Sequence, residues 1–185
     1  FQLIFFIRTV MVMSVQREIQ IQTYHSPVGP LIIGSFNDQL CLCDWQHRQS
    51  RPTIDKRIQT SLRAHYKEKN APVIKQTIEQ LNQYFHNHLQ QFDLPLLMLG
   101  TDFQRQVWLA LQQIPYGKTL SYQALAGNIN HQKAVRAVAN ANAANAISLV
   151  IPCHRVISSK GQLTGYAGGV ETKRQLLALE KTNIK

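Results

Sequence analysis

Hydrophobic and polar residues alternate in the first part of this chain. Ile19, Ile21 and Thr23 alternate with polar residues. Two turn-forming stretches, Ser26-Pro27-Val28-Gly29 and Asn37-Asp38, then separate this segment from the apolar runs 31–36 and 40–45. A period of two is typical of strands that bury one face, and such turns join neighbouring antiparallel strands. The pattern predicts a small antiparallel meander.

Helical spacing replaces this alternation after a polar stretch, residues 46–57, which we interpret as irregular. Pro72 opens a predicted helix, because proline is favoured in the first helical turn. The apolar residues of this helix recur on one face: Val73, Ile74, Ile78, Leu81, Phe85 and Leu89. Residues 94–99 are predicted to form a strand or an extended connector.

The second part of the chain is predicted to be mostly helical. Thr101 caps a helix with an apolar stripe formed by Phe103, Val107, Trp108 and Leu111. Ser121 caps a short helix that ends near Ala126, and after a glycine-containing turn at 127–130 a second helix runs from about His131 to Ala143. Two short helices joined in this way are typical of a helix-turn-helix.

A glycine-rich loop, residues 161–169, precedes a final predicted helix from Val170 to about Lys181. The predicted fold class is therefore α+β, with a composition change near Gly100-Thr101 that we interpret as a domain boundary. We expect residues 1–14 to be an extension outside the fold, 15–99 to form a sheet-plus-helix domain and 100–185 to form a mainly helical domain.

The charge of the chain indicates a polyanionic partner. The net charge is +10, and residues 101–185 hold 10 basic but only 3 acidic residues. A basic face favours nucleic acid over membrane, although solubilising surface charge is the plain alternative. Residues 1–14 are apolar but too short to span a bilayer, and they lack the features of a secretory signal. We therefore expect no membrane partner.

The cysteine count predicts a reducing compartment, the cytoplasm. The chain has only Cys41, Cys43 and Cys153, an odd and sparse set that argues against a disulfide scaffold. No pairing has zinc-site spacing, so neither a metal nor another cofactor is predicted. Cys41 and Cys43 stand two residues apart in a predicted strand, so we expect both on the same side of the sheet as small core residues.

Cys153 has the sequence context of a reactive thiol. It lies between Pro152 and two residues that can carry positive charge, His154 and Arg155. Positive charge nearby lowers a thiol pKa and favours the nucleophilic thiolate. Apolar residues 149–151 precede it, which predicts a thiol at the edge of the core, in an extended segment. From these residues alone, an inert buried cysteine beside a surface arginine fits equally well.

The second helix of the helix-turn-helix is rich in alanine, which predicts docking on DNA with little sequence readout. Arg, Asn and Gln side chains usually read base edges, whereas the surface around Ala134 and Ala137 is smooth. Arg136 stands alone among small residues, where it could enter the base stack in place of an extruded nucleotide, while Lys133 contacts phosphate. The alternative is that Arg136 is an ordinary exposed residue.

Several segments together resemble the O6-alkylguanine-DNA alkyltransferases, also called methylated-DNA–protein-cysteine methyltransferases. The resemblance is strong over about 103–180 and rests on the following residues: Pro152-Cys153-His154-Arg155-Val156, Ser121-Tyr122, Arg136, Asn145, Tyr166-Ala167-Gly168-Gly169 and Leu176-Leu177-Ala178-Leu179-Glu180. It implies a ribonuclease H-like first domain and a DNA-binding alkyltransferase second domain. It also implies a monomer that binds double-stranded DNA and transfers an alkyl group from guanine O6, and from O4-alkylthymine, irreversibly to Cys153.

The resemblance assigns roles to the residues around the thiol. Glu180 would orient His154, and His154 would withdraw the thiol proton through a water molecule, which is the general logic of an activated nucleophile. Tyr122 would rotate the DNA phosphate and later donate a proton to guanine N3. Asn145 would brace the turn before the active site.

The resemblance also defines a substrate pocket. Tyr166 would form one wall, the Ala167 N–H would bind O6, and the backbone carbonyls of Cys153 and Val156 would accept hydrogen bonds from the guanine amino group. Ala167 stands where some relatives have serine. Ala146 and Ser148 replace prolines of some relatives, which we expect to open the pocket to larger alkyl groups.

Three other functions compete with alkyl transfer. A cysteine hydrolase needs a distant His and an oxyanion hole, and the adjacent Cys153-His154 pair does not suit it. A helix-turn-helix regulator without transfer activity would need a recognition helix that reads bases. An alkyltransferase-like protein that binds DNA lesions without repairing them would lack the acceptor cysteine, which is present here.

Overall fold

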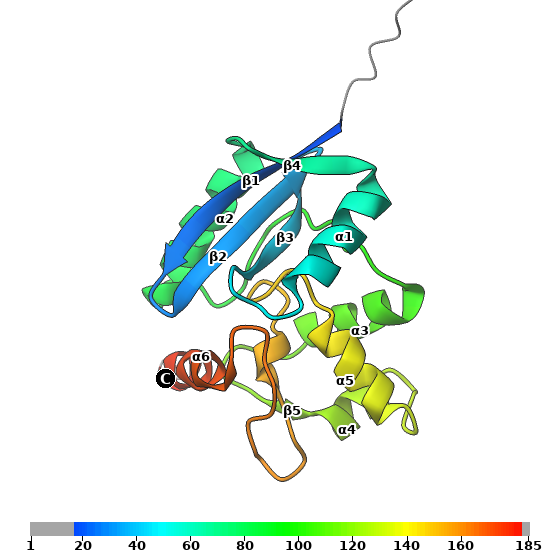
Figure 1. Cartoon of the computed structure of the whole chain (residues 1–185). Helices are drawn as coiled ribbons and strands as arrows, with labels where there is room; N and C mark the ends of the chain where they lie inside the picture. The colour runs from blue at the N-terminus through cyan, green and yellow to red at the C-terminus, as the bar shows by residue number, and fades with distance from the viewer. Residues whose placement is uncertain (1–16, 183–185) are drawn as a thin grey trace, which may run out of the picture.

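The computed structural model describes residues 17–182, so the predicted extension at 1–14 lies outside the described residues. The N-terminal part, 17–99, holds a sheet in the order β3-β2-β1-β4, with β1 (Arg17–Ser26), β2 (Gly29–Phe36), β3 (Gln39–Trp45) and β4 (Ala64–Glu68). Helix α2 (Pro72–Phe85) packs on one face of the sheet, and α1 (Arg51–Leu62) lies on the other side (Figure 1). The antiparallel pairing of β1, β2 and β3 confirms the predicted meander.

The sheet is mixed rather than purely antiparallel, because β4 pairs parallel to β1. The sequence prediction missed both β4 and α1, which begins within the stretch interpreted as irregular. Only Ile54, Ile58 and Leu62 of α1 are buried, at a spacing of four, and polar residues fill the other positions. This narrow stripe is enough to cover the sheet, but it is a weak signal in a polar sequence.

The prediction that Cys41 and Cys43 share one side of the sheet is wrong. The register between β2 and β3 shifts at Gly34 and Ser35, which places an extra residue, Cys41, in β3. Such a β-bulge breaks the alternation of the strand. Cys41 therefore packs in the core beside α1, whereas Cys43 packs in the larger core shared with the C-terminal part. Both are buried core residues, as predicted.

The C-terminal part, 100–182, is mainly helical, as predicted. Its helices are α3 (Asp102–Gln112), α4 (Tyr122–Asn128), α5 (Val135–Ala143) and α6 (Val170–Lys181). Thr101 caps α3 through a reciprocal capping box with Gln104, and the Ser121 hydroxyl accepts a hydrogen bond from the Ala124 N–H at the start of α4. Helices α4 and α5 form the predicted helix-turn-helix, but α5 begins at Val135, later than predicted.

The two parts share one hydrophobic core and are joined by backbone pairing. The Cys43 N–H donates to the Ala146 carbonyl at 2.9 Å, and the Ser148 N–H donates to the Cys43 carbonyl at 2.6 Å. Strand β3 thereby holds the segment that leads to Cys153. The predicted strand or connector at 94–99 is extended and touches β3 through a single bridge between Leu40 and Leu96. Among residues 17–182, no helix is long and apolar enough to cross a membrane.

The close contact between Gly168 and the Trp45 ring allows the packing between the N-terminal and C-terminal parts to be tested. A Cβ atom on Gly168 would lie 2.7 Å from the Trp45 ring, which is rigid and 4% exposed. We predict that Gly168→Ala lowers the free energy of unfolding by about 1–3 kcal/mol, because overpacking must displace the ring or the loop. Gly165→Ala is the matched control, since its Cβ would meet open space. Urea denaturation measures both, and equal effects of the two substitutions would contradict the contact.

Candidate active site

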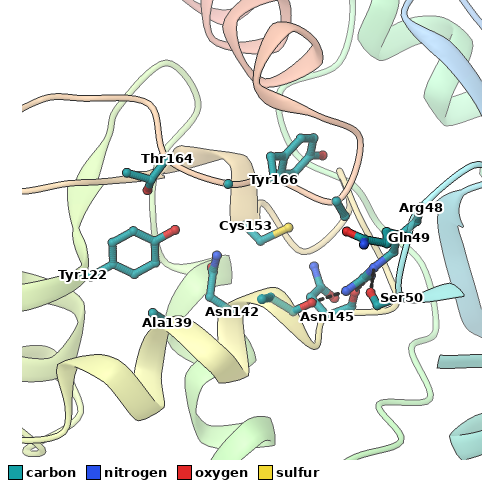
Figure 2. A pocket seen from close by; sticks show the side chains of 13 residues that line it. Arg48, Gln49, Ser50, Tyr122, Ala139, Asn142, Asn145, Cys153, Thr164 and Tyr166 are labelled. Carbon is teal, nitrogen blue, oxygen red and sulfur yellow. Dashed lines mark hydrogen bonds between the residues drawn. The ribbon is translucent and has the colours of Figure 1, made fainter. Parts of the chain in front are cut away.

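Cys153 lies in a cavity of about 670 Å³ formed by both parts of the chain. Figure 2 shows its sulfur pointing into this space, with Tyr122 on one side and Arg48 and Gln49 on the other. The walls come from the loop after β3, from α4 and α5, and from the loop before α6, with these residues among them: Arg48, Gln49, Ser50, Tyr122, Ala139, Asn142, Thr164, Tyr166 and Ala167. The thiol is 3% exposed, at the edge of the core as predicted.

A tight turn places Cys153. The Ile151 N–H donates to the Ile147 carbonyl at 2.9 Å, and Leu149 adopts a left-handed conformation with φ of 71°. Asn145 spans this turn, because its Nδ2 donates to the Ile151 carbonyl at 2.9 Å and its Oδ1 accepts from the Ile147 N–H at 2.9 Å. Cys153 then begins a short 3-10 helix, so the extended segment predicted from the sequence is wrong.

A fully buried carboxylate, that of Glu180 on α6, organises the residues after Cys153. It accepts hydrogen bonds from His154 Nε2 at 2.7 Å, Arg155 Nε at 2.9 Å, the Tyr84 hydroxyl at 2.8 Å and the Gly117 N–H at 3.0 Å. Burial acts to raise the pKa of Glu180, but the contacts with His154 and Arg155 outweigh it and lower the pKa to about 2. Glu180 is therefore an anion at neutral pH.

His154 is placed to accept a proton. Its side chain is fully buried, and burial lowers its pKa despite the opposing contact with Glu180, so the ring is neutral at neutral pH. Glu180 occupies Nε2, while Nδ1 has no hydrogen-bond partner among the described residues. Because the carboxylate favours the proton on Nε2, the lone pair lies on Nδ1, as general-base chemistry requires.

The charge around the thiol differs from the sequence prediction. His154 and Arg155 turn to Glu180, so they do not supply the cation that the predicted lowering of the thiol pKa required. Burial instead raises the pKa of Cys153, and this rise is opposed by hydrogen bonding from Asn145 and by the positive charge of Arg48. A neighbouring base is consequently needed to form the thiolate.

Sequence reasoning missed Arg48, Tyr84 and Lys173. The Lys173 side chain is fully buried, and its Nζ donates to the Val156 carbonyl at 2.6 Å and the Thr164 carbonyl at 3.2 Å. It thus ties the loop before α6 to the strand after Cys153. Helical spacing places Tyr84 and Lys173 on the buried stripes of α2 and α6, but it does not reveal their partners, and no local pattern distinguishes Arg48 from a surface residue.

The expected pocket residues divide into two groups. Tyr122, Tyr166 and Ala167 line the cavity, whereas Ser148 and Val156 are not among its described lining residues. The Ser148 hydroxyl turns to Asp44 at 3.3 Å instead. Ala146 packs in the core beside α1, so the expectation that Ala146 and Ser148 open the pocket is wrong. At these positions the backbone of the chain pairs with β3.

The expected DNA-contacting residues lie beside this cavity. Tyr122, Lys133 and Arg136 line an adjoining hollow of about 600 Å³, and Tyr122 and Ala139 border both spaces. Lys133, Arg136 and Ala137 are exposed, and Ala134 is half-buried. Lys133 and Ala134 stand in the turn before α5 rather than on the helix, because α5 begins at Val135. Within residues 17–182, no cluster of His, Cys, Asp and Glu could hold a metal ion.

Comparison with known proteins decides the family. The family model described as 6-O-methylguanine DNA methyltransferase, ribonuclease-like domain, matches residues 19–98, and that of the DNA binding domain matches 102–182. A methylated-DNA–protein-cysteine methyltransferase of Mycobacterium bovis is 40% identical, over 89% of this chain and 93% of the relative. The chain belongs to the 6-O-methylguanine DNA methyltransferase family.

Other members of this methyltransferase family agree with the fold. The relative of the same name from Methanosarcina barkeri is 42% identical, over 86% of this chain and 96% of its own length. A crystal structure of the Mycobacterium tuberculosis protein in complex with DNA is 39% identical and superposes with a TM-score of 0.77, covering 90% of this chain and 94% of that chain. The α+β class and the ribonuclease-like first part are thus confirmed, and the family's activity is alkyl transfer from DNA to a protein cysteine.

The buried carboxylate makes the stability of this methyltransferase depend on pH. Because the pKa of Glu180 in the folded state is about 2, below its ordinary value near 4.5, its contribution is complete above about pH 4.5 and is lost as the pH falls toward 2. We predict a loss of about 3 kcal/mol across that range from this group. Glu180→Gln should unfold more easily at pH 7 and show a flatter acid profile in urea denaturation. An unchanged acid profile in that variant would refute the assignment.

Proposed function

We propose that Cys153 is the alkyl acceptor for O6-alkylguanine, and by the same chemistry O4-alkylthymine, in double-stranded DNA, with one transfer per protein molecule. The observation that carries this proposal is a thiol in a cavity, followed in the chain by a neutral His154 whose Nε2 binds the Glu180 anion. The cavity shares Tyr122 and Ala139 with the hollow lined by Lys133 and Arg136. A base extruded from DNA bound at this hollow would therefore lie close to the thiol.

The chemistry begins with proton transfer. His154 Nδ1 withdraws the Cys153 proton through a bridging water, and the anion of Glu180 stabilises the imidazolium that results. The thiolate attacks the alkyl carbon, a carbon–sulfur bond forms, and the electron pair of the carbon–oxygen bond passes to guanine. Tyr122 protonates N3, since burial raises its pKa and keeps the hydroxyl protonated. The proton on His154 then passes through water to the Tyr122 phenolate, so that overall the thiol proton is exchanged for the alkyl group.

The transfer is irreversible because nothing removes the alkyl group from the thioether. The other two thiols, Cys41 and Cys43, are buried in the cores around the sheet, and burial raises the pKa of Cys41 to about 12. They are therefore poor nucleophiles. This arrangement also distinguishes the protein from a lesion-binding relative without an acceptor thiol and from a regulator that only binds DNA.

DNA binding is assigned to the helix-turn-helix surface. Arg136 fills the gap left by the extruded nucleotide, Lys133 contacts phosphate, and Ala134 and Ala137 allow close approach to the groove wall. The exposure of Lys133 and Arg136 around the hollow beside Tyr122, and that of Ala137, support these roles. We further propose a domain boundary at Gly100, supported by the family-model limits, and a cytoplasmic location, supported by three free thiols. The family resemblance also leads us to propose a monomer.

The first prediction from this proposal concerns the acceptor. Cys153→Ser should abolish transfer and leave DNA binding intact, because the thiol is only the acceptor. Intact-mass measurement after incubation with O6-methylguanine DNA should show one methyl adduct, located by peptide mapping on Cys153. Cys41→Ser is the control and should retain transfer. An adduct on Cys41 or Cys43, or more than one methyl per protein, would exclude the mechanism.

The second prediction separates base extrusion from chemistry. Arg136→Ala should slow transfer from alkylated duplex DNA more than transfer from free O6-benzylguanine, because the free base leaves no gap to fill. Single-turnover rates on the two substrates measure this difference. Lys133→Ala, the control, should weaken duplex binding and reduce its salt dependence while leaving the free-base rate unchanged. Equal losses on both substrates for Arg136→Ala would mean that this residue supports the fold or the pocket.

A further inference from the structure

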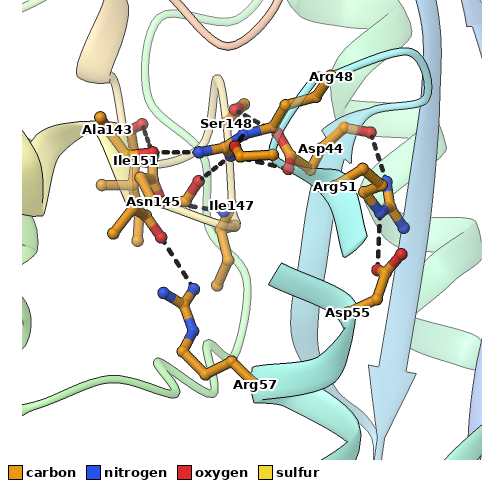
Figure 3. A network of polar contacts seen from close by, with 12 residues as sticks. Asp44, Arg48, Arg51, Asp55, Arg57, Ala143, Asn145, Ile147, Ser148 and Ile151 are labelled. Atoms are coloured by element: carbon orange, nitrogen blue, oxygen red, sulfur yellow. Dashed lines mark hydrogen bonds and ion pairs between the residues drawn. The ribbon is translucent and has the colours of Figure 1, made fainter. Parts of the chain in front are cut away.

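Arg48 connects the sheet to the turn that carries the thiol. It lies in the loop after β3, is 7% exposed, and donates to Asp44 Oδ2 at 2.8 Å and to Ser50 Oγ at 2.7 Å on its own side. Across the junction it donates to the Asn145 carbonyl at 2.8 Å and to the Ala143 carbonyl (Figure 3). One guanidinium thus satisfies carbonyls at the end of α5 and at the start of the active-site turn.

These contacts continue to Cys153 in two steps. Arg48 holds the backbone of Asn145, and the Asn145 side chain holds the Ile151 carbonyl, two residues before the thiol. The last carbonyls of a helix carry partial negative charge, so a cation at this place is also favoured by the dipole of α5. Arg57 caps the neighbouring Ala144 carbonyl at 2.8 Å, but it is not among the residues that line the cavity.

Arg48 also lines the cavity wall and acts electrostatically on the Cys153 thiol. Several charged or titratable groups act on Cys153 from the elements around it: Arg48 and Asp44 from the sheet side, Lys173 from α6, Tyr122 from α4, and Tyr166 from the loop before α6. Among the charged groups, Arg48 has the largest effect and lowers the pKa of Cys153, while Asp44 raises it. His154 and Arg155 are engaged by Glu180 instead.

We propose that Arg48 is a positioning residue for alkyl transfer, which fixes the turn before Cys153 through Asn145 and stabilises the thiolate with its charge. The proposal rests on the assignment of Cys153 as the acceptor. It gives the N-terminal part a direct role in reactivity. Asp44, which is fully buried, forms an ion pair with Arg48 and opposes the effect of its charge on the pKa of Cys153.

The test compares two variants that should shift the pH of thiolate formation at Cys153 in opposite directions. Arg48→Gln removes the positive charge, so thiolate formation should shift to higher pH. Asp44→Asn removes the opposing negative charge, so it should shift to lower pH. Both should unfold at lower temperature than the wild type, because each leaves a buried partner unpaired. A purely structural role would lower stability without these opposite shifts. Arg57→Gln is the matched control, and should lose a carbonyl cap without moving the thiol titration.

Two measurements are made on each full-length variant. The rate of Cys153 modification by iodoacetamide against pH reports the thiolate without any DNA repair, and single-turnover transfer from O6-benzylguanine reports the reaction. If iodoacetamide titrations shift in opposite directions while no variant reacts with O6-benzylguanine, the electrostatic proposal stands and the proposed function fails. If Arg48→Gln leaves the titration unmoved, or both variants shift it in the same direction, the Arg48 proposal is overturned.

A conservative variant, Arg48→Lys, keeps the proposal testable if Arg48→Gln does not fold. Arg48→Lys keeps the charge but loses the planar fork that reaches two carbonyls and a carboxylate at once. It should retain a thiol titration near that of the wild type and transfer the benzyl group more slowly. If Arg48→Gln does not fold, the pair Arg48→Lys and Asp44→Asn decides the question. A titration in Asp44→Asn that does not move to lower pH would then overturn the proposal.

Discussion

The burial of one carboxylate, Glu180, is the constraint on which the rest of the site depends. A buried anion is costly unless donors surround it, and here the donors come from α2, from the loop after α3 and from the residues after Cys153. Satisfying Glu180 therefore fixes the distant segments that carry Tyr84, Gly117, His154 and Arg155 relative to one another. Burial keeps His154 neutral, and the Glu180 contact orients its ring so that Nδ1 has no hydrogen-bond partner among residues 17–182.

The active site belongs to both parts of the chain. Strand β3 pairs with the segment at 146–148, Arg48 reaches the carbonyls around Asn145, and Tyr84 donates to Glu180 from the far side. The C-terminal part contains the thiol, the proposed base and the proposed DNA-binding surface, but its active-site turn is also held by contacts from the N-terminal part. On the proposed function, Asn145 and Arg48 favour the charged form of a thiol whose pKa is raised by burial.

Local signals in the sequence predicted much of this structure, and distant contacts account for what they missed. The caps at Thr101 and Ser121 and the apolar stripe of α2 each lie within a few residues, so they could be read directly. The bulge at Cys41 and the partners of Arg48 depend on pairing across the fold, which no local pattern encodes. For the same reason the sequence predicts that His154 and Arg155 act electrostatically on Cys153, although Glu180 binds both.

The central claim is that His154 and Glu180 activate Cys153 as a unit, and a double-mutant cycle on the transfer rate tests it most directly. Single-turnover rates with O6-methylguanine duplex DNA would be measured for His154→Gln, Glu180→Gln and the double variant. Since Glu180 is proposed to act on the thiol through His154, either single change should slow transfer strongly, and the double change should cost little more. Losses that add fully in the double variant would show that the two residues act independently and would contradict the account.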